Sequence, residues 1–271
     1  MTTNFLDRPT GRLAYERSGD PDGPLVVLSP GMGDVRSTYR ELAAALAADG
    51  ANVVTADLRG HGESSTGWDD GYSVSAVADD LLALLREHGG RGVLVGNSYS
   101  GSAAVVAAAR EPQAVTGLVL SGAFVREHKA SAVNAALFSL FTHTFPGRPL
   151  WTAYAWPSFF KRRPADFAAR KAELKANLAR PHGYDALAWI CKEGSHAGTE
   201  QQLGRVQAPA LVVMGSKDPD FPDPAVEARY TADSLAGPAE VMLVDGVGHY
   251  PHTEAADVVV PEVVAFVRKV S

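Results

Sequence analysis

The stretch Val93-Leu-Val-Gly-Asn-Ser98-Tyr-Ser-Gly101 decides the fold of this chain of 271 residues. Its apolar start has the length of a buried strand, and residues 101–110 after it have the spacing of a helix. A serine between such a strand and such a helix lies on a strained turn that lifts its hydroxyl above the sheet. The small residues Gly96 and Ser100 leave room for the chain to turn. The pattern therefore makes Ser98 a candidate nucleophile.

The same alternation of short apolar runs and longer amphipathic runs continues on both sides of this turn. It predicts a mostly parallel sheet joined by right-handed crossovers and flanked by helices, which is an α/β fold. We also expect residues 12–17 to form an antiparallel strand at the edge of the sheet. The predicted strands cover residues 25–28, 52–56, 92–95, 115–120, 210–214 and 240–244, and the predicted helices cover 39–48, 74–87, 101–110, a segment from 225, and 255–269.

The alternation is interrupted between residues 124 and 206. This segment has a helical pattern and holds 12 of the 22 aromatic residues. Over 124–205 it carries 12 basic and 6 acidic residues, a balance of +6, whereas the rest of the chain carries 13 and 25, a balance of −12. A basic, aromatic-rich helical insertion into an acidic α/β chain is typical of a cap. We therefore expect a core of residues 1–123 and 207–271 and a helical cap of residues 124–206.

The motif Gly96-x-Ser98-x-Ser100 resembles the nucleophile elbow Gly-x-Ser-x-Gly of the α/β-hydrolase superfamily. Ser100 stands where the family usually has glycine, and its small side chain should preserve the turn. A second segment, Asp57-x-Arg59-Gly-His61-Gly-x-Ser64, is similar to a structural loop of the same family, so we expect its side chains to support the site. The resemblance covers about residues 11–123 and 207–270. It implies the α/β-hydrolase fold with an inserted helical cap.

A nucleophilic serine needs a base, and the base needs an acid that orients it. The family order is serine, acid, histidine. Gly215-Ser-Lys-Asp218 resembles the family's acid loop, and Gly246-Val-Gly-His249 resembles its histidine loop. Both loops follow the ends of predicted strands, where open α/β sheets build their sites. The resemblance therefore implies a catalytic triad of Ser98, Asp218 and His249.

Neighbouring residues compete for two of these roles. Asp220 and Asp223 are alternatives to Asp218, and His252 is an alternative to His249, although their offsets from the strand ends match the family less well. His249 and His252 could also suggest a metal site, but the sequence supplies no further ligands near them, so we expect no metal. We interpret His252 as a surface residue at the start of a helix.

The resemblance also implies an oxyanion hole made by the backbone N–H groups of Met32 and Tyr99. Met32 lies in Ser29-Pro-Gly-Met-Gly-Asp34, and this chain has Pro30-Gly31 where the family often has His-Gly. Because the donor belongs to the main chain, the change need not remove it. Asp34 beside the expected hole is interpreted as a helix N-cap, with a polar contact to the substrate as the alternative.

Charge and cysteine content narrow the functional class. With 25 basic and 31 acidic residues the formal net charge is −6, which argues against binding to nucleic acid or to anionic membranes. Cys191 is the single cysteine, so no intramolecular disulfide is possible and a reducing compartment fits. Residues 1–16 contain no apolar block of signal-peptide length, and polar residues interrupt the longest uncharged stretches. We therefore expect a cytoplasmic protein without a membrane span.

Two other classes remain as alternatives. Gly31-x-Gly33 after a strand partly fits a dinucleotide-binding turn, but Arg36 stands where the fingerprint needs Gly or Ala. Asp57 also lies 26 residues after Gly31, compared with about 20 in the fingerprint. A phosphate-binding loop would need a Gly-Lys-Ser/Thr sequence, which is missing. The second alternative is a non-catalytic binding protein on the hydrolase fold, which turnover would distinguish.

Within the α/β hydrolases, Ser98 at the elbow excludes the haloalkane dehalogenase and epoxide hydrolase branches, which use aspartate. Asn97 is similar to the meta-cleavage-product hydrolases, which break carbon–carbon bonds, so this reaction stays an alternative. The favoured interpretation is a cofactor-independent serine esterase that forms an acyl-enzyme from a small-molecule substrate, with its oligomeric state undetermined. Four aromatic residues of the expected cap are candidates for an apolar pocket wall, although core packing is an alternative for most of them: Trp151, Trp156, Phe159 and Phe160.

Overall fold

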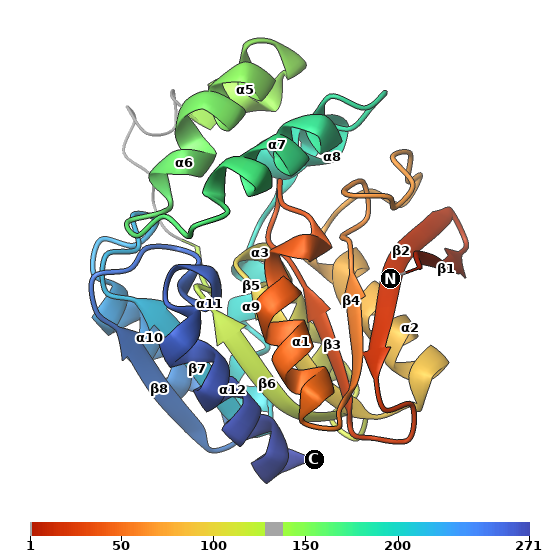
Figure 1. Cartoon of the computed structure of the whole chain (residues 1–271), viewed down its shortest axis with the longest axis vertical. Coiled ribbons are helices and arrows are strands. Elements are labelled where there is room, and N and C mark those ends of the chain that lie inside the picture. Colours follow the sequence, from red (N-terminus) through yellow and green to blue (C-terminus); the bar gives the residue numbers. More distant parts are fainter. Residues whose placement is uncertain (1, 128–137) are drawn as a thin grey trace.

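The computed structural model describes residues 2–127 and 138–271. Its strands are β1 (Asn4–Arg8), β2 (Gly11–Gly19), β3 (Leu25–Ser29), β4 (Asn52–Ala56), β5 (Gly92–Asn97), β6 (Val115–Ser121), β7 (Ala210–Gly215) and β8 (Ala239–Val244). Within the described residues they form one eight-stranded sheet in the order β1-β2-β4-β3-β5-β6-β7-β8 (Figure 1). The strands from β4 to β8 in this order pair in parallel, whereas β2 pairs antiparallel with β1 and β4. The predicted α/β class with a mostly parallel sheet is confirmed.

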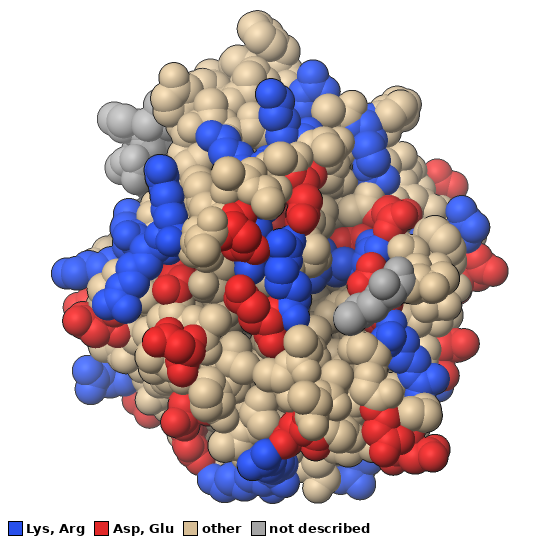
Figure 2. Space-filling view, in the orientation of Figure 1, with Lys and Arg blue, Asp and Glu red and all other residues tan. Residues whose placement is uncertain are grey.

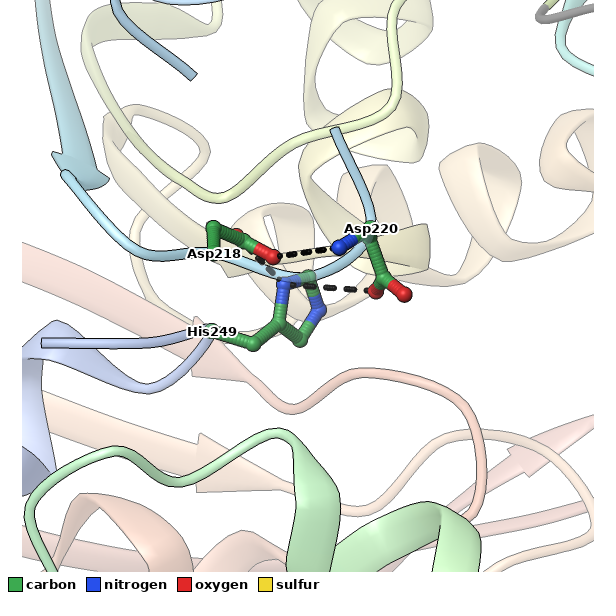
Figure 3. A group of neighbouring side chains, drawn as sticks. All are labelled: Asp218, Asp220 and His249. Carbon is green, nitrogen blue, oxygen red and sulfur yellow. Dashed lines mark hydrogen bonds and ion pairs between the residues drawn. The ribbon is translucent and has the colours of Figure 1, made fainter. Parts of the chain in front are cut away.

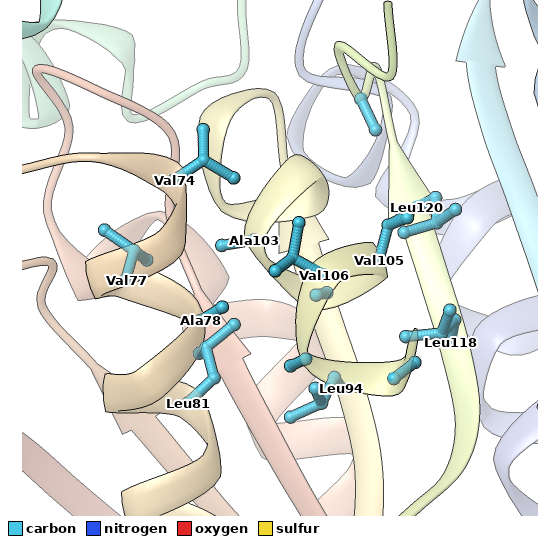
Figure 4. Close-up of a cluster of buried hydrophobic side chains, with 14 of the residues drawn as sticks. Val74, Val77, Ala78, Leu81, Leu94, Ala103, Val105, Val106, Leu118 and Leu120 are labelled. Carbon is cyan, nitrogen blue, oxygen red and sulfur yellow. The ribbon is translucent and has the colours of Figure 1, made fainter. Parts of the chain in front are cut away.

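Helices cover both faces of this sheet. Successive strand residues point to opposite sides, and the apolar residues on each side pack against helices. Val27 and Leu94 belong to the buried cluster under one set of helices, and Val26 and Val93 belong to the cluster under the other. Figure 4 shows the first cluster, in which side chains of two helices pack over Leu94. The helices on that face are α2 (Val74–His88), α3 (Tyr99–Arg110) and α10 (Pro224–Ser234), and those on the other are α1 (Arg40–Ala48) and α12 (Ala256–Val270).

The structure corrects three predicted boundaries near the site or the sheet edge. Helix α3 begins at Tyr99, two residues earlier than predicted, because its first turn consists of small and polar residues that hydrophobic periodicity does not detect. The helix predicted at 39–48 is preceded by the 3-10 turn η1 (Arg36–Tyr39). The strand predicted at 12–17 is antiparallel as expected, but β1 forms the edge outside it. β1 lacks a buried face, so its sequence carries no apolar alternation.

The described part of segment 124–206 is helical, and residues 128–137 of the expected cap lie outside the described residues. Its elements are η2 (Leu140–Thr142), α5 (Thr144–Leu150), the π-helix η3 (Trp151–Ala155), α6 (Trp156–Ser158), α7 (Phe167–Leu178), α8 (Asp185–Glu193), α9 (Ala197–Glu200) and η4 (Leu203–Arg205). Trp151 lies against the loop after β3, since a Cβ on Gly33 would be 2.8 Å from the indole nitrogen. The helices α5 to α8 thus lie beyond the carboxyl ends of the strands (Figure 1). No helix among the described residues is long and apolar enough to cross a membrane.

Candidate active site

Ser98 occupies a strained turn between β5 and α3. Its φ of 55° and ψ of −117° lie in a region that residues with a side chain rarely adopt. A Cβ on Gly96 would lie 2.6 Å from the Gly101 nitrogen, and a Cβ on Gly101 would lie 2.6 Å from the Cβ of Ala123. The Ser98 N–H donates to the carbonyl of Ser121 at 2.9 Å. The turn therefore fixes Ser98 at the carboxyl end of the sheet, where it lines a cavity.

Two buried side chains beside Ser98 hold this turn through hydrogen bonds to the backbone. The Ser100 hydroxyl donates to the carbonyl of Ser29 at 2.6 Å and accepts from the N–H of Asn97 at 3.0 Å. The Asn97 amide donates to the carbonyls of Ser121 at 3.0 Å and His249 at 3.1 Å. Ser100, at the usual glycine position, thus adds hydrogen bonds to the turn, and Asn97 links it to the loop after β8.

Asp218 and His249 meet above the neighbouring strand ends (Figure 3). Asp218 follows β7, His249 follows β8, and His249 Nδ1 lies 2.8 Å from Asp218 Oδ2. Both side chains are buried. A Cβ on Gly122 would lie 3.0 Å from this Nδ1 and 3.2 Å from this Oδ2, so a glycine is needed between the pair and the elbow. The Ser98 hydroxyl makes no hydrogen bond to another described residue.

Asp220 places a second carboxylate near His249. Its Oδ2 lies 3.5 Å from His249 Nδ1, and its side chain is 25% exposed and lines the cavity. Burial alone would lower the pKa of His249, but Asp218 and then Asp220 outweigh burial and raise this pKa above its ordinary value. Burial first, and the charge of Asp218 next, raise the pKa of Asp220. Of the two competing acids, Asp218 makes the shorter contact with the imidazole.

The other residues that competed for roles at the site lie elsewhere. Asp223 caps α10, with its Oδ1 accepting the N–H of Val226 at 3.0 Å. His252 does not lie on the surface as predicted: it belongs to the buried helix α11 (Pro251–Glu254) and stacks on Tyr39 with 4.7 Å between ring centroids. Burial lowers its pKa to about 3. The prediction of a surface position was wrong because the sequence indicates that His252 lies at a helix start but does not indicate that the η1 turn covers its side chain.

Asp34 does not cap a helix, in contrast to the prediction. The N-cap position before η1 is Val35, and Asp34 Oδ1 accepts the N–H of this same residue at 2.8 Å. Burial raises the pKa of Asp34 to about 6. The 3-10 turn starts one residue later than an Asp34 cap would require, so this carboxylate is buried beneath the loop instead. Asp34 does not line the cavity beside Ser98.

The loop after β3 places backbone donors beside the elbow. A Cβ on Gly31 would lie 3.0 Å from the Cβ of Ser98, so the loop and the turn are in direct contact. Met32 and Tyr99 line the cavity together with Ser98. Neither of their N–H groups donates to another described residue, and Tyr99 begins α3, where N–H groups have no partner within the helix. Both N–H groups thus lack a hydrogen-bond partner among the described residues, as an oxyanion donor would.

His61 supports this loop from beneath. Its Nε2 accepts the N–H of Gly33 at 2.8 Å, and its Nδ1 lies 3.0 Å from the carbonyl oxygen of Arg59. Burial lowers the pKa of His61 to about 4, so the ring is neutral and donates through Nδ1. Asp57 fixes the next turn by accepting the N–H of Arg36 at 2.7 Å. These contacts are those of supporting residues, as the sequence predicted for this loop.

A cavity of about 420 Å³ opens beside Ser98. Of the four predicted pocket residues, Trp151 and Phe159 line this cavity. Trp156 and Phe160 do not, since they pack on each other at 4.7 Å between ring centroids and join the core of the helical segment. The sequence analysis missed most of the remaining wall: Phe124, Arg126, Glu127, Phe138, Phe141, Ile190 and His196. Phe124 follows the end of β6, so the strand-end rule could have found it, whereas the others depend on how the helices pack.

The same site offers three possible metal ligands. Asp218, Asp220 and His249 each contribute an atom, and these atoms lie within 4.8 Å of one another. Both carboxylates, however, approach the same ring nitrogen, Nδ1. A nitrogen that donates its proton to a carboxylate has no lone pair for a metal. The arrangement suits proton transfer better than metal binding.

On the face drawn in Figure 2, the basic residues of segment 124–206 do not form a continuous positive surface. Figure 2 shows acidic and basic side chains intermixed on one face of the molecule. Arg170 in α7 binds Asp166 at 2.7 Å, and Arg40 of α1 binds Asp166 at 2.9 Å and Glu173 at 2.7 Å. These ion pairs commit basic groups to the contact between α7 and the sheet domain. They leave less positive charge to attract an acidic substrate.

Comparisons with known proteins show which proteins this chain is similar to. Residues 26–262 match the sequence model of a family described as the alpha/beta hydrolase family. RutD of Variovorax paradoxus, named as a candidate carbamate hydrolase, is 28% identical over 90% of this chain and 92% of its own. A monoacylglycerol lipase of Mycolicibacterium smegmatis is 29% identical over 80% of this chain and 77% of its own. Among solved structures, a thermophilic esterase from Thermogutta terrifontis has a TM-score of 0.83 at 23% identity, covering 100% of this chain and 99% of that one.

Proposed function

The chain belongs to the alpha/beta hydrolase family, and we propose that it is a cofactor-independent serine hydrolase acting on a carboxylic ester of a small or medium organic acid. The observation that carries the proposal is the 2.8 Å contact of His249 with Asp218 beside the strained turn at Ser98. Acyl transfer needs a nucleophile, a base that contacts the nucleophile, and an acid that orients the base. The names of two relatives, a monoacylglycerol lipase and a candidate carbamate hydrolase, support an acyl compound as substrate.

In the proposed mechanism, Ser98 Oγ attacks the carbonyl carbon while His249 Nε2 takes the hydroxyl proton. Asp218 holds the proton on Nδ1 and stabilises the imidazolium that forms. The N–H groups of Met32 and Tyr99 donate to the oxyanion of the tetrahedral intermediate. His249 then protonates the leaving alcohol, and water activated by the same ring releases the acyl group. The hydrogen bond between Ser98 and His249 forms in the substrate complex, as it commonly tightens there.

We further propose that residues 124–206 act as a cap on a catalytic core of residues 1–123 and 207–271. Trp151 and Phe159 from this segment line the cavity together with Ser98 and Tyr99 from the core. Aromatic walls exclude water and bind apolar groups, and about 420 Å³ suits a small molecule. This wall favours an aromatic or medium-length acyl group.

The alternative of carbon–carbon bond hydrolysis gains no support from the site. Asn97, the residue that suggested it, uses its amide N–H groups on two backbone carbonyls. Its role in this structure is to link the elbow to the histidine loop. The other alternative, a non-catalytic binding protein on the same fold, differs from the proposed enzyme in that it would show no substrate turnover.

The proposal is tested with p-nitrophenyl esters of several chain lengths and with a fluorophosphonate probe read by mass spectrometry. We expect wild type to hydrolyse the esters and to be labelled on Ser98, and Ser98→Ala to lose both by several orders of magnitude. Ser100→Ala is the matched control and should still be labelled. Labelling that persists in Ser98→Ala would move the nucleophile elsewhere. A folded wild type that is neither labelled nor active would overturn the serine mechanism.

A further inference from the structure

We infer that Asp220 is a specificity-determining residue that makes the cavity accept uncharged ester substrates and reject anionic ones. The inference rests on the proposed function, because it requires a substrate bound beside Ser98. Asp220 lines the same cavity as Ser98, whereas the side chain of Asp218 is fully buried. Of the two carboxylates near His249, Asp220 is therefore the one that a substrate meets.

The loop after β7 fixes the position of this second carboxylate. The N–H of Asp220 donates to Asp218 Oδ1 at 3.0 Å, and its Oδ2 lies 3.5 Å from His249 Nδ1 (Figure 3). A distance of 3.5 Å is longer than a normal hydrogen bond. The contact with His249 is thus mainly electrostatic. The carboxylate lies in the cavity wall, and because its pKa is raised to about 6, it carries its negative charge above that pH.

The other charged side chains of the cavity are already committed. Arg126 binds Glu227 through two nitrogens, with a closest distance of 2.7 Å, and its guanidinium lies 3.8 Å from the ring centroid of Tyr230. Glu127 accepts the backbone N–H of His196 at 2.5 Å. Apart from His196, the charged side chains that the described residues contribute to the wall are therefore one cation, which is neutralised outside the wall, and two carboxylates.

The groups packed around His249 do not offset this negative charge. Asp218 and Glu254 both raise the pKa of the ring, so they add negative charge. His249 is the cation that acts most strongly on Asp220, and the weaker cation is Lys161, whose side chain is exposed to solvent. His252 is neutral, because burial lowers its pKa to about 3. Protonation of His249 itself is matched by Asp218.

Two consequences follow for catalysis. A substrate carboxylate in the cavity is repelled by Asp220 and meets no uncommitted cation on the described part of the wall, which should disfavour it roughly tenfold or more. Asp220 also stabilises the imidazolium of His249 together with Asp218. Its removal should lower the pKa of His249 and shift the acid limb of the pH profile of kcat/KM to lower pH.

The experiment uses two matched ester pairs, because the cavity could hold either part of the substrate. In the first pair, p-nitrophenyl hemisuccinate carries the charge in the acyl part and p-nitrophenyl valerate does not. In the second pair, 4-carboxyphenyl acetate carries it in the alcohol part and 4-methylphenyl acetate does not. Each kcat/KM is measured for wild type, for Asp220→Asn and for Asp233→Asn, which makes the same change at an exposed position of α10.

We expect wild type to prefer the uncharged member of at least one pair on the order of tenfold, as like-charge repulsion requires. Asp220→Asn should reduce that preference by about the same factor, and its acid limb for the uncharged ester should shift to lower pH. Asp233→Asn should match wild type in both respects. The pH shift is a readout that a merely structural role would not move.

Three results would overturn the inference, and they are distinguishable. If Asp220→Asn keeps the wild-type preference for the uncharged ester in both pairs and Ser98 is labelled normally by the fluorophosphonate, Asp220 does not determine specificity and the proposed function stands. Loss of labelling in Asp220→Asn alone assigns Asp220 a structural role instead. Absence of labelling in wild type removes the proposed function, and the inference with it.

Discussion

At the scale of single residues, the neighbouring Ser98 and Ser100 have opposite roles. The Ser98 hydroxyl has no partner among the described residues, whereas Ser100 bonds to the backbone of Ser29 and Asn97. We expect Ser98→Ala to change the free energy of unfolding by less than about 0.5 kcal/mol, and Ser100→Ala to lower it by about 1–3 kcal/mol, since a buried N–H loses its acceptor. Urea unfolding measures both values. Equal losses in the two variants would contradict this division of roles.

The neutral ring of His61 leads to a second prediction at this scale. His61→Ala leaves the N–H of Gly33 without its acceptor and loosens the donor at Met32 next to it. We expect kcat to fall roughly 10- to 100-fold with a much smaller change in KM, because the oxyanion donor acts mainly in the transition state. Steady-state kinetics measure this, with His182→Ala at an exposed position as control. A loss confined to KM would show that the loop keeps its geometry without His61.

Much of the candidate site could be predicted because its residues follow strand ends. Asp218 and His249 come after β7 and β8, so the parallel order of the sheet brings them together. Residues whose role depends on packing between helices could not be assigned in this way. Trp151 reaches the cavity and Trp156 does not, although both are buried aromatics a few residues apart. Their directions depend on the π-helix between them, which no sequence period indicates.

At the scale of elements, α7 is held to η1 and α1 by polar contacts. Arg170 in α7 is buried and donates to the carbonyl of Thr38 at 3.1 Å and to Asp166 at 2.7 Å. Glu173 accepts from the hydroxyl of Ser37 at 2.6 Å. Breaking a buried ion pair usually costs more than breaking an exposed one, because the partner stays desolvated. The position of α7 therefore depends mainly on Arg170.

We expect Arg170→Ala to lower the free energy of unfolding by about 1–3 kcal/mol, because the buried carbonyl of Thr38 loses this donor while Asp166, whose side chain is 32% exposed, keeps Arg40. Its KM for esters should also rise, since α7 packs beside the π-helix that carries Trp151. Lys175→Ala, on the exposed side of the same helix, should change neither quantity appreciably. Urea unfolding and ester kinetics on the two variants give the comparison. A stability loss of the same small size in both would show that apolar packing alone holds α7.

At the scale of the whole molecule, the parallel part of the sheet was predictable because it is buried on both faces. Strands such as β3, β4 and β7 are buried at every position, so they form continuous apolar runs that the sequence displays directly. β1 and η1 were missed because short, partly exposed elements carry no such run. The protonation of buried histidine side chains also has a consequence for the whole molecule. Because burial lowers the pKa of His61 and His252 and keeps both rings neutral in the fold, stability must depend on pH.

His252 makes this dependence testable. Its ring is buried against Tyr39, and neither ring nitrogen has a hydrogen-bond partner among the described residues. Its folded pKa is about 3, compared with an ordinary value of 6.5, so below pH 6.5 the unfolded chain binds a proton that the folded chain does not. Stability therefore falls as the pH drops from 6.5 toward 3, by about 1.4 kcal/mol per pH unit from this group.

His252→Phe keeps the ring contact with Tyr39 and removes this proton. The free energy of unfolding should then fall with decreasing pH less steeply than in wild type, by about 1.4 kcal/mol per pH unit, while exposed His143→Phe should leave the slope unchanged. Chemical unfolding at several pH values between about 4 and 6.5 measures the slopes, within the window that the two pKa values set. An equal slope in wild type and His252→Phe would mean that the buried ring is protonated in the fold.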